Sequence, residues 1–539
     1  MAFPALPAKI SRSALWAVLV VVVALCAYGN SLQNGFVWDD QPIIVKNAQN
    51  RDPGALGQIA LGLDNSRATE KNPYYRPLTR LSYWVEYQVH GLNPALCHLA
   101  NLALHAGNAL LVYRLGLLLF ALETPAALAA LLFALHPVNS EAVNFLSTRN
   151  TLLSTLFVLA ACLAFIGGMS GNRRRGALCC GLFFLAGTFS KESALCLIPL
   201  LPVLAQRLSG SPPREALTRA LPALGACTGA ALVYLCLRHL VLSGAGVTLQ
   251  ILPGLGERLL EILYLVPCSL LPVVWPAALT PYYPLPVQWG PLVPGLIAAW
   301  LAIGAVLFWV AGRGRCTATV VGLCWYLLFY LPACGIVPLP SAPMAERYLY
   351  LPAIGVWFIA AEVARRATVS FPAKRTLLVA AAAALLLALG VRTVLRNQDW
   401  QSNYTLFARL AETSPQMPFA HHNLGTAYLD DLKDLPRAQA EFERTLALDP
   451  QYPRTQTEFG YLEMLRGNPG GADVHLQQAI ARDPEDAEAH FNRALVLEQL
   501  GRPAEAIPHL EKFLAIDNPE FAGTRTEAQE RLAALKGQH

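Results

Sequence analysis

Residues 14–28, ALWAVLVVVVALCAY, form an apolar run without a single charged side chain. Lys9 and Arg12 precede this run and no convincing small-residue cleavage site follows it, so we read a retained membrane span with its N-terminus inside. Similar runs recur as far as Leu395, and the whole chain is 54% hydrophobic and 14% charged. That composition is too apolar for an ordinary soluble protein. The sequence therefore predicts an all-α polytopic membrane domain over residues 1–396, followed by a polar domain over residues 397–539.

The basic residues between the apolar runs indicate how the chain crosses the membrane. Short loops rich in Lys and Arg remain on the inner side, which places Arg173, Arg174 and Arg175 inside. About eleven transmembrane helices and a long first outer loop, residues 29–98, result from this register. The expected spans are residues 14–28, 99–119, 125–135, 152–169, 177–188, 194–204, 221–242, 291–310, 320–331, 351–363 and 377–395. This order places the first loop and the C-terminal domain on the same, outer side.

Residues 259–275 are apolar but do not fit this register. Counting them as a span would place six downstream cations outside, namely Arg313, Arg315, Arg365, Arg366, Lys374 and Arg375. Three prolines, Pro267, Pro272 and Pro276, also interrupt the segment. We therefore interpret residues 259–275 as a re-entrant or interfacial helix on the outer side.

Charge, cysteines and motifs exclude several classes of protein. The net charge is only +5 and the cations are dispersed in short clusters, which argues against a nucleic-acid partner. All twelve Cys precede Asn397, mostly within apolar runs, so they read as small buried side chains. Neither a zinc-binding spacing nor a phosphate-binding glycine loop is present. We expect no metal site and no cofactor, and membrane lipids as the surroundings.

A period of 34 residues marks the polar C-terminal domain. Ala438, Ala472 and Ala506 recur at this spacing, which is that of tetratricopeptide repeats. Gly425 would let the paired helix approach closely, with Tyr428 packing across it. A half-repeat at residues 404–412 and a closing helix at residues 524–535 would cap about three repeats. Such an α-solenoid usually holds an extended peptide or a partner, here the expected protein acceptor.

Acidic and aromatic side chains gather in the first outer loop. Asp39 and Asp40 are adjacent carboxylates soon after the first span, although in isolation a solvated loop or a helix cap would be the more common explanation. Pro77 opens an expected helix whose aromatic residues suit a membrane interface. This helix could border the entry of a lipid-borne donor or simply brace the loop.

Other polar residues fall where the expected spans reach the outer surface. Ionisable groups at membrane depth are costly unless they are paired or solvated, so their convergence indicates a polar cavity, with structural salt bridges as the alternative. They are His136, Asn139, Glu141, Arg149, Lys191, Glu192, Glu346 and Arg347. A carboxylate beside an acceptor hydroxyl can take its proton, while Arg or Lys neutralises a leaving phosphate. Glycosyl transfer from a lipid phosphate would use such a set.

The same segments resemble the family of transmembrane and tetratricopeptide-repeat-containing protein O-mannosyltransferases and, more distantly, the protein O-mannosyltransferases of the GT-C superfamily. The resemblance spans nearly the whole chain, in the same order and at similar spacing. The stretches that carry it are GFVWDD (residues 35–40), YRPLTRLSYWVEYQVHGLNPALCHLANLALH (75–105), LLFALHPVNSEAV (131–143), SKES (190–193), AERYLYLP (345–352) and RNQDWQSNYTLF (396–407).

This resemblance implies a metal-independent, inverting transfer of mannose from a polyprenyl-phosphate donor to Ser or Thr of a protein. It places Asp39 and Asp40 at the catalytic centre, and Arg76 and Arg347 on the donor phosphate. Further substrate-binding residues carried over are His136, Glu141 and Lys191.

The short repeat array and the compact, Ala/Leu-rich chain resemble a bacterial homologue. Such a protein would lie in the cytoplasmic membrane with the first loop and the repeats in the periplasm; a eukaryotic one would lie in the membrane of the endoplasmic reticulum. Two other functions stay open. One is a non-catalytic scaffold that recruits envelope proteins through the repeats, and the other is a glycosyltransferase acting on lipid or polysaccharide.

Overall fold

The computed structural model describes residues 12–62, 74–243, 255–286, 290–312, 317–336, 342–516 and 521–537. Arg313 and Arg315 of the topology argument lie outside these ranges. The described residues form helices and connecting loops, and their one β-type pairing is an isolated bridge between Tyr283 and Met344. The all-α prediction is confirmed. The chain divides into two compact units, which are described separately.

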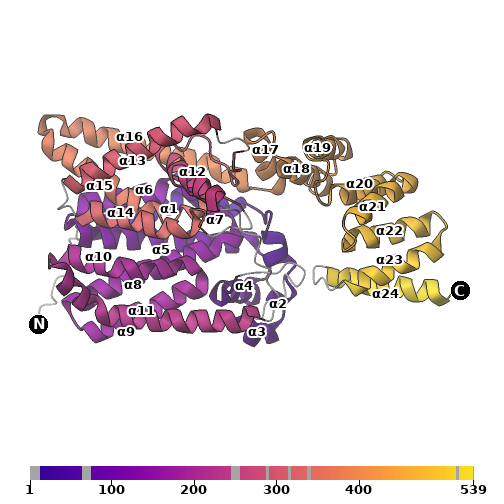
Figure 1. Ribbon diagram of the computed structural model, residues 1–539, viewed down its shortest axis with the longest axis horizontal. Helices are drawn as coiled ribbons and strands as arrows, with labels where there is room; N and C mark the ends of the chain where they lie inside the picture. The colour runs from indigo at the N-terminus through magenta and orange to yellow at the C-terminus, as the bar shows by residue number, and fades with distance from the viewer. Residues whose placement is uncertain are drawn as a thin grey trace, which may run out of the picture. The chain divides into compact units, whose positions relative to one another are not determined.

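The first unit contains residues 12–35, 56–62 and 74–400 of the described chain. Its long helices lie side by side, with α8, α9 and α11 as neighbours (Figure 1). Their bounds are α1 Arg12–Tyr28, α5 Pro94–Phe120, α6 Glu123–Leu135, α7 Ser140–Asn144, α8 Arg149–Ser170, α9 Arg173–Ser190, α10 Leu197–Ser209, α11 Pro213–Leu242, α12 Leu255–Val274, α13 Val293–Gly312, α14 Thr317–Tyr330, α15 Ala353–Ser370 and α16 Arg375–Asn397.

Five described helices are long and apolar enough to cross a membrane, and a sixth results if α6 and the following segment to Asn144, bent by 50°, form one broken span. The apolar stretches Gly290–Ala305 and Thr317–Ala333 are shorter. Several apolar helices support an integral membrane protein. The count of eleven spans stays a prediction, as does the re-entrant interpretation of α12, which contains Pro267 and Pro272.

Small residues allow close contact between helices of this unit. A Cβ added to Gly322 of α14 or Gly355 of α15 would collide with the backbone of the other helix. Helices in membranes use such small residues because lipid gives no hydrophobic drive for association, so direct backbone packing must hold them together. The glycine pair therefore fixes α14 against α15.

Amide side chains join three chain segments in the buried interior of the first unit. Asn397 donates to Asn30 Oδ1 at 2.8 Å and accepts from Asn144 at 2.8 Å. Asn144 Oδ1 in turn accepts from Asn34 at 3.0 Å. Because buried amides are stable only when hydrogen-bonded, this network fixes the ends of α1, α7 and α16 relative to one another.

The first-loop residues of this unit include the helix that Pro77 was predicted to open. Helix α4 spans Pro77–His90 and places Pro77 at its first position, where the missing N–H costs nothing. The short helix α3, Leu56–Ala60, packs beside α4. Helix α4 ends at Gly91, whose φ of 65° turns the chain toward α5.

The second unit contains described residues 36–55 and 401–516 with 521–537, so part of the first loop groups with the C-terminal helices. Three antiparallel helix pairs follow α17 and precede α24 (Figure 1). Their bounds are α17 Asn403–Thr413, α18 Pro418–Asp430, α19 Leu435–Leu448, α20 Thr455–Leu465, α21 Pro469–Arg482, α22 Ala487–Gln499, α23 Pro503–Ala515 and α24 Ala522–Gly537, and the loop adds α2 Ala48–Arg51. The repeat period predicted this arrangement.

Gly425 lets the helices of the first pair approach, as predicted. A Cβ there would lie 2.5 Å from the ring of the buried Phe442. We expect Gly425→Ala to lose about 1 kcal/mol, because overpacking of roughly 1–3 kcal/mol exceeds the helix-propensity gain of about 0.5–1 kcal/mol. Limited proteolysis of the full chain should then cut the repeat unit about fivefold faster. Gly523→Ala, at an exposed position with open space, is the control and should not accelerate cleavage.

Candidate active site

Arg76 and Glu192 form a bidentate ion pair in the first unit. Arg76 precedes α4, and its Nε and Nη2 donate to the Glu192 carboxylate at 3.0 and 2.6 Å. Its guanidinium also stacks 4.0 Å from the centre of the Tyr74 ring. Burial would raise the pKa of Glu192, but Arg76 outweighs it and holds this pKa at about 2. The pair is therefore charged at neutral pH, and Arg76 has a fixed orientation.

Lys191 lies at the end of α9, beside this pair. Its Nζ donates to Thr151 Oγ1 at 2.9 Å and lies 5.8 Å from the centre of the Tyr348 ring. Burial and the positive charge of Arg76 lower the pKa of Lys191 to about 7, while Glu192 opposes the shift. Lys191 therefore gains or loses its proton near neutral pH.

Arg347 and Glu141 form a second, more deeply buried pair. Glu141 is fully buried, and its carboxylate accepts both the Arg347 Nη1–H and the Arg347 backbone N–H, the latter at 2.8 Å. The Arg347 guanidinium lies 5.0 Å from the centre of the Tyr348 ring. Arg347 and Glu141 both act electrostatically on Lys191. Four of the predicted site residues, Arg76, Lys191, Arg347 and Glu141, are thus brought together.

A second buried carboxylate adjoins this group. Glu346 accepts hydrogen bonds from Arg396 Nη2 at 3.1 Å and from the Tyr283 hydroxyl at 3.3 Å. Burial raises the pKa of Glu346 to about 8, with Arg396 opposing and Glu141 adding to the shift. Its Oε2 is buried without a hydrogen-bond partner. Arg396 Nη1 pairs with Asp399 at 2.6 Å, so the guanidinium bridges two carboxylates.

His136 and Arg149, both at expected outer ends of spans, have other neighbours. His136 lies in the break between α6 and α7, where its ring is 4.6 Å from that of Trp357 and its Nδ1 accepts from the Val138 N–H at 3.2 Å. Arg149 forms an ion pair with Glu86 at 2.6 Å. Arg149 therefore makes a salt bridge of the kind that structural pairing predicts, and His136 caps the short turn Pro137–Asn139.

Asp39 and Asp40 belong to the second unit and differ in environment. Asp40 is fully buried, and its Oδ2 accepts the Val37 N–H at 3.1 Å, which closes the turn. Asp39 is partly exposed, and its carbonyl oxygen accepts the Ile43 N–H at 3.1 Å. Asp39 is thus the more exposed of the two residues, and the Asp40 carboxylate closes the turn.

The acidic loop is anchored to the first helices of its own unit. Trp38 has a φ of 50°, an unusual value for a bulky residue, and its N–H donates to Asn403 Oδ1 at 2.8 Å. Its ring packs on Phe407, with centroids 6.1 Å apart, and on Phe419, at 5.6 Å. Ser402 and Thr405 form a capping box that starts α17 and positions Asn403. These contacts give a structural role to Ser402, Asn403, Thr405 and Phe407, which lie in the RNQDWQSNYTLF stretch.

Sequence reasoning did not assign roles to Tyr74, Tyr283, Tyr348 or Arg396. Tyr348 and Arg396 lie within the quoted stretches and Tyr74 directly precedes one of them, so their position was the available signal. No sequence signal pointed to Tyr283, because it lies between α12 and α13, far from any motif.

This chain is similar to known proteins in its repeats and over most of its sequence. The Tetratricopeptide repeat family model matches residues 457–520. A solved oligosaccharyltransferase of Archaeoglobus fulgidus, tethered with an acceptor peptide, has 14% identity and a TM-score of 0.42, and the match covers 75% of this chain and 57% of that chain.

Curated relatives match much more of the sequence than the repeat model does. A protein O-mannosyl-transferase of Caenorhabditis elegans is 26% identical over 81% of this chain and 63% of its own length. Protein O-mannosyl-transferase Tmtc3 of Drosophila melanogaster is 26% identical over 92% of this chain and 58% of its own length. The chain thus spans about three fifths of these relatives. Its homologues are the protein O-mannosyl-transferases of the TMTC type, which agrees with the resemblance read from the motifs.

Proposed function

We propose that this protein is a membrane glycosyltransferase that moves a sugar, with mannose as the first candidate, from a polyprenyl-phosphate donor to Ser or Thr of exported proteins. The reaction takes place on the outer side of the membrane, which is the periplasmic side in a bacterium. The tetratricopeptide unit holds the acceptor polypeptide. The names of the homologues support a sugar transfer to protein.

The observation that carries this proposal is the cationic group of Arg76, Lys191 and Arg347. Two carboxylates, Glu192 and Glu141, neutralise the two guanidinium groups, so the charge of the group depends on Lys191. A phosphate diester brings one negative charge, which protonated Lys191 would balance. Arginines held in fixed orientations also suit the recognition of phosphate oxygens. We therefore assign the donor phosphate to this group.

Lys191 should make donor binding depend on pH. Because an anion favours the charged amine, the bound donor raises the pKa of Lys191 above its value of about 7 in the free protein. Affinity should then fall as the pH rises through 7 toward the bound pKa, by about tenfold for each unit that the pKa shifts. The measurement is the donor KM between pH 6 and pH 9. Lys191→Arg, which stays charged, should flatten the profile; an unchanged slope in this variant would exclude Lys191.

Asp39 is proposed as the general base and Asp40 as the residue that shapes its loop. The acceptor oxygen attacks the anomeric carbon from the face opposite to the phosphate, and Asp39 takes the hydroxyl proton. The bond between the anomeric carbon and the phosphate oxygen breaks, and polyprenyl phosphate leaves with its electron pair. Inversion and independence of metal ions are expectations from the resemblance and are part of the proposal.

The direct test incubates the purified full chain with labelled mannose on polyprenyl phosphate and a mixture of envelope proteins. Label on Ser or Thr of protein is the expected result. Parallel reactions with glucose, galactose and N-acetylglucosamine on the same lipid identify the sugar. Label on lipid or polysaccharide, with none on protein, would overturn the acceptor class, and no transfer from any donor would overturn the enzyme proposal.

A further inference from the structure

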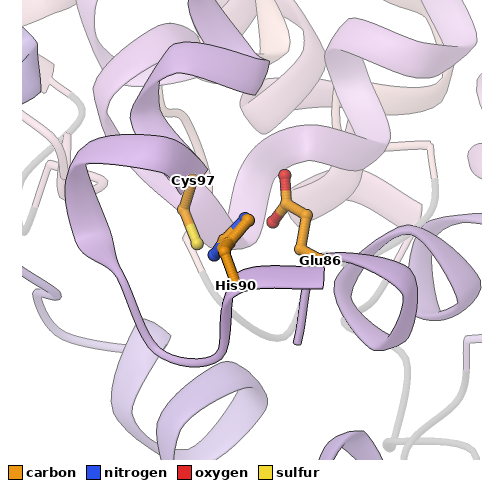
Figure 2. Close-up of side chains that lie close together, drawn as sticks. All are labelled: Glu86, His90 and Cys97. Carbon is orange, nitrogen blue, oxygen red and sulfur yellow. The ribbon is translucent and has the colours of Figure 1, made fainter. Parts of the chain in front are cut away.

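Three metal-ligating side chains meet where α4 turns into α5. A carboxylate oxygen of Glu86, a ring nitrogen of His90 and the Cys97 sulfur all lie within 4.8 Å of one another. Figure 2 shows the three side chains grouped, with His90 between the other two. We propose that they bind a divalent transition-metal ion of the zinc class, at a site separate from the glycosyl-transfer residues.

Local chain geometry creates this group. Glu86 and His90 are four residues apart on α4, so they share one face of the helix. Gly91, with its positive φ, reverses the chain directly after His90. Asn93 accepts the Leu96 N–H and starts α5, which brings Cys97 into the first turn of that helix. The ligands thus come from two rigid helices joined by a three-residue turn.

The donor atoms match a borderline-soft ion. Oxygen, imidazole nitrogen and thiolate sulfur are all ligands of zinc at about 2.0–2.3 Å, whereas calcium and magnesium prefer oxygen alone. His90 Nδ1 is buried and makes no hydrogen bond. A buried ring nitrogen without a partner is costly, and coordination would satisfy it. Three protein ligands leave one position of a tetrahedral ion for water or another exogenous ligand.

Arg149 is a neighbouring cation, and its positive charge opposes binding of a metal ion at this site. Its Nη1 lies 2.6 Å from Oε2 of Glu86. Because a carboxylate has two oxygens, Glu86 can contact Arg149 and an ion at the same time. Arg149 also donates to Asn101 Oδ1 at 2.7 Å and to the Cys97 carbonyl at 3.2 Å. Such outer contacts orient metal ligands. Binding displaces the thiol proton of Cys97 to solvent, and the thiolate and Glu86 offset two of the three positive charges carried by the ion and Arg149.

The ion would hold α4 against α5 and would not take part in sugar transfer. Arg76 precedes the first turn of α4 and His90 is its last residue, so 14 residues of helix, about 21 Å, separate them. An ion at the far end of α4 fixes the helix that begins beside Arg76. The expected metal-independent chemistry and this structural site are therefore compatible.

The test uses the full chain with an affinity tag that contains no histidine, stripped with a chelator and dialysed against Co²⁺ or Zn²⁺. We expect one ion per chain by mass spectrometry of the metal, and a thiolate-to-cobalt charge-transfer band in the near ultraviolet. Cys97→Ser should abolish the band, and His90→Gln should weaken binding by about tenfold or more. The controls Cys334→Ser, at another buried cysteine, and His239→Gln, at an exposed histidine, should behave as wild type.

A second measurement needs no variant and covers the case in which Cys97→Ser fails to fold. Zn²⁺ should protect Cys97 of the wild type from alkylation, read residue by residue by peptide mass spectrometry, while Cys334 is unaffected. Absence of the cobalt band in the wild type, persistence of the band in Cys97→Ser, or equal alkylation of Cys97 with and without Zn²⁺ would each overturn the proposal.

Discussion

Asp39→Asn should reduce sugar transfer by roughly 10²–10⁴-fold, the usual contribution of a general base. The amide has nearly the shape of the carboxylate but cannot take the acceptor proton. Asp40→Asn should have a much smaller effect, because an amide oxygen can still accept the Val37 N–H that closes the turn. Initial rates of label transfer from the lipid donor to protein measure both variants beside the wild type.

The order of the two effects tests the assignment. Equal thermal stability of Asp39→Asn and wild type, together with an unchanged donor KM, would show that the loss lies in the chemical step. If Asp40→Asn lost as much activity as Asp39→Asn at unchanged stability, the two carboxylates would act as a coupled pair and our division of their roles would be wrong.

Arg347→Met should cost about 3–5 kcal/mol of unfolding free energy and also weaken donor binding. The substitution leaves the fully buried Glu141 without its ion-pair partner, and an uncompensated buried charge is strongly destabilising. Equilibrium unfolding in mixed detergent micelles gives the free energy. In comparison, Arg437→Met removes an exposed pair with Asp434 and should cost less than about 1 kcal/mol.

A double variant separates stability from donor binding. Arg347→Met with Glu141→Gln removes both charges, so most of the lost stability should return, while the donor KM should remain high. A return of both stability and donor affinity would show that Arg347 has only a structural role.

Periodicity predicted the parts of the fold that depend on local sequence. The 34-residue recurrence and Gly425 predicted the helix pairs, because each repeat must bury the same face. Pro77 predicted the start of α4. The number of membrane spans was harder to predict, since short apolar helices such as α14 and proline-containing helices such as α12 give only weak sequence signals of a span.

Pairing between distant residues could not be read from the sequence. Arg149 was grouped with the outer polar residues, yet it pairs with Glu86, 63 residues earlier, because the α4–α5 turn brings that carboxylate back. The motif pattern identified Arg347 and Glu141 separately, but nothing local indicated that they bind each other across 206 residues. The sequence also did not indicate that residues 36–55 group with the repeats, because this grouping depends on contacts of Trp38 with Asn403 and Phe419.

The anchoring of Trp38 has a consequence for how proteins of this kind can be recombined. Suppose that the repeat arrays of two relatives are exchanged, by evolution or by design, with the junction at Trp400. Phe407 of α17 and Phe419 of α18 would then be replaced together with the array, and the loop that contains Trp38, Asp39 and Asp40 would lose its support. A junction after α19 keeps both the loop and the first helix pair intact. The first helices after Trp400 thus form one structural unit with residues 36–55, and only the later repeats are free to vary in number.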